Sequence, residues 1–263
     1  MRKYFYIFKT ELMTNLNYVF NILIGFIGYL IHILIFFYLW NYMYNDSSQI
    51  INGYSKFQMV WYVIITEILW ITLGGRGFCR KVNEDVKSGN ITYNLNKPYS
   101  YIGYLFSSKL GEISLKLVFY FIGGLLLGLL FLHNLPSLTL IQIIFIIVSS
   151  LLATCINIFL IMFIGLFAFF VEDTNPFYWV YSKIILIFGT LFPIEYFPKV
   201  LRPLLNFSPI YVVSYGPARM FVNFNYLEFC KIILAQIIYI IITYLLCLFV
   251  YKKGVRRLNV NGG

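Results

Sequence analysis

Residues 74–100 form the stretch GGRGFCRKVNEDVKSGNITYNLNKPYS, the longest strongly polar interval in a chain built mainly from apolar runs. Within it, Phe78, Val82 and Val86 recur at i, i+4 and i+8. This spacing predicts a helix over about residues 77–88 with a narrow apolar stripe. The other positions of that helix are charged: Arg80, Lys81, Glu84, Asp85 and Lys87.

The residues after this helix predict how the chain returns to the membrane. Gly89 stands where glycine often ends a helix in the left-handed conformation. Ile91, Tyr93 and Leu95 then alternate with polar residues before Pro98, a pattern that favours an extended segment. We therefore expect a short amphipathic helix on the membrane face, followed by an extended return to the next span.

The composition of the remaining chain indicates a membrane protein. Hydrophobic residues make up 60% of the sequence and charged residues 11%, whereas about a quarter of residues are charged in soluble domains. Apolar runs long enough to cross a bilayer, about 20 residues, occur near residues 19–42, 57–73, 115–132, 138–170, 177–191 and 227–250. The expected fold is an all-α membrane protein, a single transmembrane domain over residues 1–263 with six transmembrane helices.

The distribution of lysine and arginine predicts the orientation. Basic residues gather before the first run, between the second and third runs, and after the last. By the positive-inside rule both termini and residues 74–100 then face the cytoplasm, which places the chain in the plasma membrane as a multi-pass protein. The net charge of +10 is thus explained by topology and attraction to anionic lipids, and nothing in the sequence indicates a nucleic-acid partner.

Residues 1–16 mix aromatic and basic side chains in the sequence MRKYFYIFKTELMTNL. This mixture is typical of a helix that lies in the plane of the membrane interface. The alternative is a ragged terminal tail.

Residues 189–225 are apolar but contain five prolines, at positions 193, 198, 203, 209 and 217. Regular spanning helices do not carry prolines that densely, and a solvated loop is not that apolar. We expect short re-entrant or interfacial helices that form an outer cap over residues 191–221. Its candidate functional residues are Pro193, Glu195, Phe197, Pro198, Pro209 and Pro217; the alternative is a plug that only seals the bundle.

Two of the polar side chains inside predicted spans, Glu67 and His32, are weighed as candidate functional residues. Glu67 is interpreted as a structural hydrogen-bond partner, with a proton or cation ligand as the alternative. His32 is interpreted as a packing residue, and no second histidine or cysteine at suitable spacing indicates a metal site. Lys109, Glu112 and Lys116 share one helical face, interpreted as solvated.

Two glycines predict a close helix contact. Gly124 and Gly128 have the small-xxx-small spacing that lets another helix approach. The approaching helix could belong to the same subunit or to a second one.

Two local patterns support a resemblance to a known family. EDVKSGNITYNLNKP at residues 84–98 is similar to an acidic and basic helix, a glycine and a Leu-x-x-Pro run; FPIEYFP at 192–198 is followed by Ser208 and Pro209. With these motifs the chain resembles an ABC-2 type transporter permease, in a subgroup whose members have about the length of this chain. The sequence around Glu84 departs from the E-A-A…G signature of importer permeases, which argues against uptake.

The resemblance implies an exporter that works with a separate ATPase. It implies a dimer of identical or sister permeases, and a cytoplasmic ABC ATPase bound at the polar helix. We expect the uncovered apolar stripe of that helix to dock into the ATPase. The expected coupling residues are Phe78, Arg80, Lys81, Val82, Glu84, Asp85, Val86, Lys87 and Gly89.

The chain itself is not expected to be an enzyme. It lacks a G-x-x-x-x-G-K-[ST] phosphate loop, so ATP and Mg²⁺ are expected in the partner chain and no cofactor in this one. Short outer loops and many aromatic residues suit an amphipathic drug, peptide or lipid as substrate. The alternatives are a proton-coupled transporter that uses Glu67 and a noncatalytic membrane scaffold.

Overall fold

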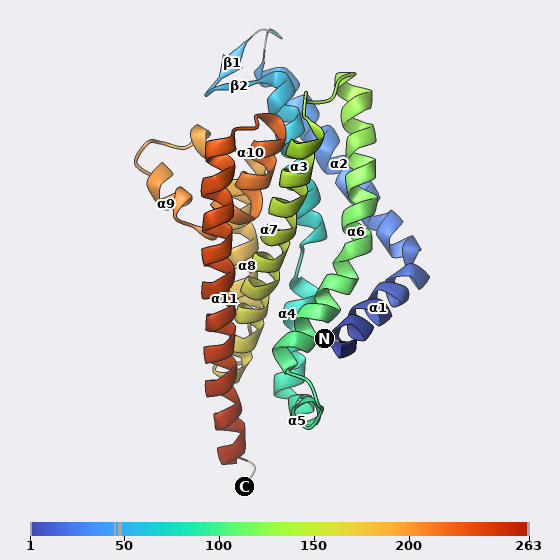
Figure 1. The fold of residues 1–263 in the computed structure, drawn as a ribbon, viewed down its shortest axis with the longest axis vertical. Helices are drawn as coiled ribbons and strands as arrows, with labels where there is room; N and C mark the ends of the chain where they lie inside the picture. Colours follow the sequence, from blue (N-terminus) through green and yellow to red (C-terminus); the bar gives the residue numbers. More distant parts are fainter. Residues whose placement is uncertain (1, 45, 47–48, 262–263) are drawn as a thin grey trace.

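Long helices stand side by side in the structure, with short helices and one small hairpin at their ends (Figure 1). The structure is a computed structural model that describes residues 2–44, 46 and 49–261. The long helices are α2 (Val19–Met43), α3 (Lys56–Thr72), α6 (Tyr101–Leu132), α7 (Leu140–Leu166) and α11 (Tyr226–Asn261). The shorter elements are α1 (Arg2–Asn17), β1 (Ile50–Ile51), β2 (Tyr54–Ser55), α4 (Arg76–Lys87), α5 (Asn90–Leu95), α8 (Asn175–Ile185), α9 (Arg202–Asn206) and α10 (Gly216–Val222).

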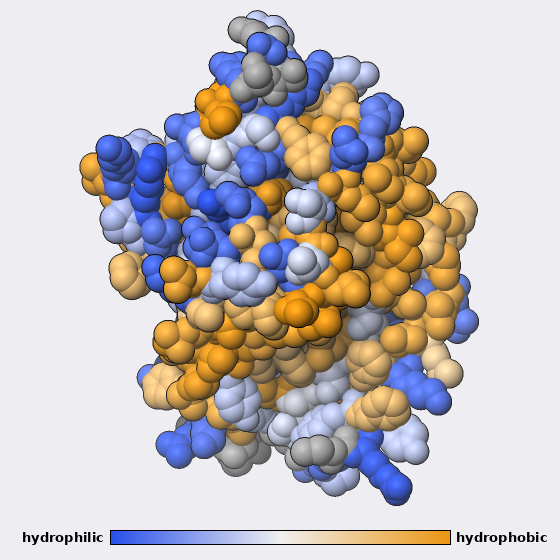
Figure 2. Space-filling model, turned by 45° about the horizontal axis from the view of Figure 1, so that its top comes forward, coloured by the Kyte–Doolittle hydropathy of each residue, from blue (hydrophilic) through white to orange (hydrophobic). Residues whose placement is uncertain are grey.

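Five helices are long and apolar enough to cross a membrane: α2, α3 together with α4, α6, α7 and α11. Hydrophobic residues cover a broad area of the face in Figure 2, and hydrophilic residues gather toward its ends. The predicted fifth span, near residues 177–191, corresponds to α8 and the π-helical turn Leu186–Leu191, elements of 11 and 6 residues. At about 1.5 Å per residue this segment is shorter than a hydrocarbon core of about 30 Å, so a layout with six spans remains a prediction.

The third predicted span lies in α6, and this helix begins before the apolar run 115–132, at Tyr101. The Ser100 hydroxyl caps the helix by accepting a hydrogen bond from the Gly103 N–H. The charged residues in this first part of α6 lowered the apparent hydropathy, but they pair with one another. Glu112 lies 3.0 Å from both Lys109 Nζ and Lys116 Nζ.

The extended return predicted for residues 91–95 is also wrong, because these residues belong to the helix α5. Gly89 adopts the left-handed conformation with φ of 75°, as predicted, and ends α4. The next turn starts at once, since both the backbone N–H and the hydroxyl of Thr92 donate to the Gly89 carbonyl. The alternating pattern of residues 91–95 was not enough to form an extended strand, because no strand among the described residues pairs with this segment.

The terminal segment α1 is an ordered helix packed on α6, which rules out the ragged-tail alternative (Figure 1). Gly103 and Gly111 of α6 allow the contact, since a Cβ at Gly111 would lie 2.5 Å from the Phe8 carbonyl oxygen. The Ser108 hydroxyl donates to Glu11 Oε1 at 2.8 Å. The position of α1 in the plane of the membrane remains a prediction.

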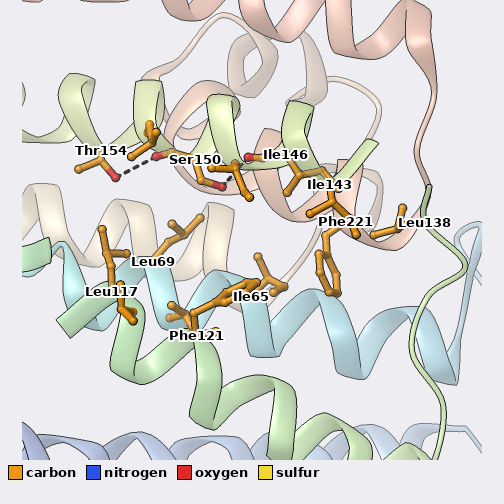
Figure 3. Close-up of a pocket in the computed structure, with 14 residues that line it drawn as sticks. Ile65, Leu69, Leu117, Phe121, Leu138, Ile143, Ile146, Ser150, Thr154 and Phe221 are labelled. Carbon is orange, nitrogen blue, oxygen red and sulfur yellow. Dashed lines mark hydrogen bonds between the residues drawn. The ribbon is translucent and has the colours of Figure 1, made fainter. Parts of the chain in front are cut away.

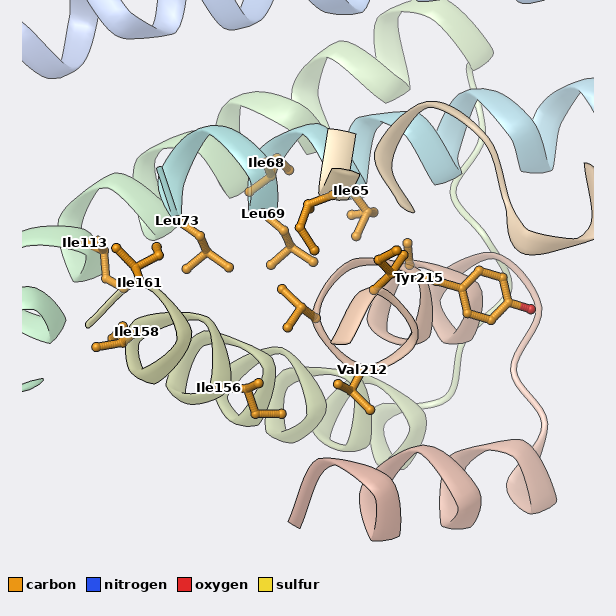
Figure 4. Close-up of a cluster of buried hydrophobic side chains, with 14 of the residues drawn as sticks. Ile65, Ile68, Leu69, Leu73, Ile113, Ile156, Ile158, Ile161, Val212 and Tyr215 are labelled. Atoms are coloured by element: carbon orange, nitrogen blue, oxygen red, sulfur yellow. The ribbon is translucent and has the colours of Figure 1, made fainter. Parts of the chain in front are cut away.

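The glycine pair of α6 packs within the chain. A Cβ at Gly124 would lie 2.5 Å from the Tyr29 hydroxyl, and one at Gly128 would lie 2.1 Å from the Trp61 ring. The close contacts therefore join α6 to α2 and α3 of the same subunit. Behind them, apolar side chains of α3, α7 and the segment before α10 fill the interior, including Ile65, Leu69, Ile156, Ile161 and Val212 (Figure 4).

Candidate functional site

The helix α4 buries the apolar stripe that the sequence predicted. Phe78, Val82 and Val86 are 6%, 0% and 6% exposed. Val82 packs against α7 at Gly165, where an added Cβ would lie 2.9 Å from Val82 Cβ. The expectation that this stripe is uncovered and docks into a partner is wrong, because the chain covers it with its own α7.

The opposite face of α4 is charged and exposed. Arg80 Nε and Glu84 Oε1 form an ion pair at 2.7 Å, with side chains 70% and 62% exposed, and Lys87 is exposed one turn further on. Lys81 and Asp85 turn instead toward α6: the Lys81 ammonium lies over the Tyr104 ring, and Asp85 accepts a hydrogen bond from the Tyr101 hydroxyl at 2.9 Å. Because Lys81 and Asp85 contact α6, the accessible charged residues among the predicted coupling residues are Arg80, Glu84 and Lys87.

The break between α3 and α4 leaves backbone groups that other helices satisfy. The Asn157 amide of α7 donates to the Leu73 carbonyl at 2.9 Å, and Gly75 N–H donates to the Tyr178 hydroxyl at 2.8 Å. The Tyr181 hydroxyl donates in turn to Asn157 Oδ1 at 2.6 Å. Non-helical backbone at membrane depth requires such partners, so the break ties α4 to α7 and α8.

Lys109 adds a third tie at the same break. Its ammonium donates to the Gly74 carbonyl at 3.1 Å and pairs with Glu112, and its side chain is only 2% exposed. The interpretation of this face as solvated was therefore wrong for Lys109. The sequence analysis also missed Asn157, Tyr178 and Tyr181. These polar side chains stand inside apolar runs, which is a signal that they have a role, but nothing in the runs indicates which groups they bind.

His32 and Glu67 meet between α2 and α3. Glu67 Oε2 lies 3.4 Å from His32 Nδ1, and the side chains are 1% and 44% exposed. Neither carboxylate oxygen has a hydrogen bond, nor does the buried Tyr29 hydroxyl, within the part of the chain that the structure describes. No hydrogen bond among the described residues supports the interpretation of Glu67 as a structural hydrogen-bond partner, and His32, which lies beside it, is not simply a packing residue.

A second carboxylate, Glu195, organises the proline-rich segment. The Tyr215 hydroxyl donates to its Oε1 at 2.6 Å and the Tyr54 hydroxyl to its Oε2 at 3.1 Å, while Arg219 Nε lies 3.8 Å from Oε1. Burial, followed by the nearby Glu195 charge, raises the pKa of Tyr54 well above its ordinary value, so this phenol stays a neutral donor. Arg202 fixes the same turn by donating to the Glu195 carbonyl at 2.7 Å.

The prolines of this segment stand where helices begin or end. Pro217 is in the first turn of α10, as Pro203 is in α9, positions that need no N–H donor. Pro193 is buried, Pro198 is exposed and Pro209 precedes the π-helical turn Tyr211–Tyr215. The rings of Phe197 and Phe188 are in a tilted contact, with their centroids 5.1 Å apart. Short helices thus replace a continuous span, as predicted, and α10 packs on α3 and α7.

Two π-helical turns, Leu186–Leu191 and Tyr211–Tyr215, lie against each other and against α3. The Gly189 carbonyl accepts hydrogen bonds from Tyr62 at 2.7 Å and Ser214 at 3.0 Å, and Thr66 donates to the Thr190 carbonyl at 2.9 Å. Such turns often occur at functional positions. The sequence does not reveal these turns, because the hydroxyl groups that donate to the Gly189 and Thr190 carbonyls come from other segments of the chain.

The apolar spans, the charged helix at one end and the folded-back segment at the other define a polytopic membrane protein. Residues 30–262 match the family described as ABC-2 family transporter protein, and the chain belongs to this family. The match confirms the resemblance inferred from the sequence motifs. Comparison with curated proteins gave no match.

Proposed function

We propose that this chain is the permease subunit of an ATP-driven exporter that moves an amphipathic substrate outward, such as a drug, peptide or lipid. A separate cytoplasmic ABC ATPase hydrolyses ATP with Mg²⁺, and this chain acts as the noncatalytic membrane component. Two permeases, identical or sister chains, form the pathway in the plasma membrane, with their termini in the cytoplasm. Membership of the ABC-2 transporter family supports the proposal.

The observation that carries the proposal is the division of α4 into two faces. The buried face packs on α7, whereas Arg80, Glu84 and Lys87 face outward. A partner can therefore contact this charged face while the buried face stays packed on α7. Charged surfaces of this kind favour specific and fast association with a complementary partner.

The contacts at the α3–α4 break provide the route by which a displacement of α4 reaches the bundle. Asn157 connects the break to α7, Tyr178 connects it to α8, and Lys109 connects it to α6. The helix α8 continues into the π-helical turn that Tyr62 and Ser214 hold. In our proposal, a movement of α4 on ATP binding is transmitted by this route to the outer cap.

The experiment is a double charge reversal on the exposed face of α4. Arg80→Glu with Lys87→Glu should abolish co-purification of the ATPase and permease-stimulated ATP hydrolysis, while the permease still inserts and purifies. The matched control is Lys253→Glu, an exposed lysine near the C-terminal end of α11, and this end of α11 lies at the same end of the molecule as α4 (Figure 1). Unchanged binding and hydrolysis in the double variant would remove α4 as the docking surface.

A second candidate function is proton-coupled transport, and one observation favours it. His32 and Glu67 lie at ion-pair distance within the bundle, where ionisable side chains commonly mark proton or ion pathways. Transport that continues without any ATPase and depends on Glu67 would support this candidate instead of the exporter.

A further inference from the structure

A groove opens between α6 and α7, although only a short turn joins the two helices. The helix α3 lies behind this groove, and Ile65, Ile68 and Leu69 form its floor. The cavity has a volume of about 240 Å³ (Figure 3). The floor is buried, whereas Val118 and Ile147 on the two walls are 60% and 50% exposed, so the groove is open toward the side of the bundle.

The groove offers no free hydrogen-bond donor to a ligand among its described side chains. Only two of its lining side chains, Ser150 and Thr154, are polar, and both hydroxyls donate within α7. The Ser150 hydroxyl donates to the Ile146 carbonyl at 2.9 Å, and the Thr154 hydroxyl to the Ser150 carbonyl at 2.8 Å (Figure 3). Because apolar cavities exclude water and accept hydrocarbon, the chemistry of the groove selects an alkyl chain.

A polar pocket adjoins the groove. The two share Leu138 and Phe221, and the polar pocket has a volume of about 450 Å³. Its remaining walls include Ser55, Gln58, Ser137, Gln142 and Asn223. An apolar groove beside a polar pocket has the two-part character of an amphiphile.

The polar pocket presents uncharged hydrogen-bond donors. Gln58 Oε1 accepts from the Ser55 N–H at 3.0 Å, and Gln142 Oε1 accepts from the Thr139 N–H at 2.9 Å. Their oxygens are therefore occupied, while neither amide NH₂ group has an acceptor among the residues that the structure describes. Among the described residues, no aspartate, glutamate, lysine or arginine lines this pocket, although arginine and lysine are the usual partners of phosphate and carboxylate groups.

We propose that the groove and the polar pocket together bind one membrane lipid. Its alkyl chain lies in the groove between α6 and α7, and its uncharged, hydroxyl-bearing head group lies in the polar pocket. The source of the ligand is the bilayer, because the open side of the groove is formed by two membrane-spanning helices. The site needs no ATPase, so it stands independently of the exporter mechanism.

The test uses the full chain alone in lipid nanodiscs that contain a photoactivatable diacylglycerol, with photoactivatable phosphatidic acid in a parallel sample. Mass spectrometry of the cross-linked peptides should locate the diacylglycerol on the groove walls of α6 and α7, with much weaker labelling by phosphatidic acid. Ile147→Trp fills the groove and should reduce the diacylglycerol cross-link several-fold. Ile144→Trp is the matched control, because Ile144 is 57% exposed on the same helix and does not line the groove.

A second pair of variants tests the opposite wall if Ile147→Trp does not fold. Val118→Trp should reduce the cross-link, and Ile122→Trp, 54% exposed on α6 and outside the groove, should not.

For the head group, Asn223→Ala should weaken labelling, and Asn134→Ala outside the pocket should not. Equal labelling in each variant and its control, equal labelling by the two lipids, or protein–protein cross-links from the groove to a second copy would each overturn the proposal.

Discussion

The imidazole of His32 and the carboxylate of Glu67 lie 3.4 Å apart between α2 and α3, with the carboxylate buried and the imidazole partly exposed. An unpaired charge at this depth in a membrane is costly. A protonated imidazole on His32 would offset part of the cost of a charged Glu67. If His32 is neutral, protonation of the Glu67 carboxyl would remove the charge itself. His32 therefore connects a buried acid with the surface of α2.

We predict that Glu67→Gln leaves most of the permease-stimulated ATP hydrolysis intact. The amide has the shape of the carboxyl group and can remain beside His32, so the free energy of unfolding should change by about 1 kcal/mol or less. The measurement is ATP hydrolysis by the co-purified ATPase in proteoliposomes across a pH series.

His32→Gln is the companion variant, since it removes the titratable partner and keeps the acid. Both variants should show the pH profile of the native protein. A collapse of activity in Glu67→Gln, together with loss of a pH dependence, would favour the proton-coupled candidate.

The contact between Gly128 and Trp61 predicts a large effect of one methyl group. A Cβ at Gly128 would lie 2.1 Å from the Trp61 ring, which is fully buried and donates a hydrogen bond to the Asn134 carbonyl. Gly128→Ala should therefore destabilise the protein by about 1–3 kcal/mol, the usual cost of overpacking. Thermal unfolding in detergent measures this loss.

Gly28→Ala provides the control, because nothing lies within 4 Å of a Cβ at that position of α2. Alanine favours the interior of a helix over glycine by roughly 0.5–1 kcal/mol, so this variant should be as stable as the native protein or more stable. Equal unfolding temperatures for the two variants would show that α3 and α6 are not in close contact at Gly128.

A third prediction concerns the break between α3 and α4. Asn157→Leu keeps the approximate size of the side chain but leaves the Leu73 carbonyl and the Tyr181 hydroxyl without their partner. Each buried group left unsatisfied costs about 1–3 kcal/mol, so the unfolding temperature should fall clearly. Ser150→Ala on the same helix should have little effect, because its hydroxyl bonds only within α7. Similar unfolding temperatures for both variants would contradict the role of Asn157 at the break.

The sequence predicted those helices that depend only on residues close together in the chain. The spacing of Phe78, Val82 and Val86 and the position of Gly89 sufficed to predict α4 and its end. Hydropathy predicted five of the spans. Both signals depend on short-range periodicity or on the summed hydrophobicity of a run, which a single sequence contains in full.

Contacts between distant segments could not be predicted in this way. The stripe of α4 is covered because Gly165 lets α7 approach Val82, and nothing near Val82 in the sequence indicates this. Lys109 lowers the hydropathy of its run, yet it is buried with Glu112 as its partner. The His32–Glu67 pair likewise joins two separate apolar runs, and neither run indicates the partner in the other.

The last prediction concerns the side of the membrane on which the outer cap lies. Lys199 is exposed between the turn Ile194–Tyr196 and α9, whereas Glu195 and Arg202, the other positions suited by sequence, are held in hydrogen bonds. In a background with the four native cysteines replaced, Lys199→Cys should react with an impermeant thiol reagent added outside. Lys87→Cys on the exposed face of α4 should react only from the cytoplasmic side. Labelling of Lys199→Cys from the cytoplasm would invert the proposed topology and, because α4 would then face outward and away from any cytoplasmic ATPase, it would also refute the exporter proposal.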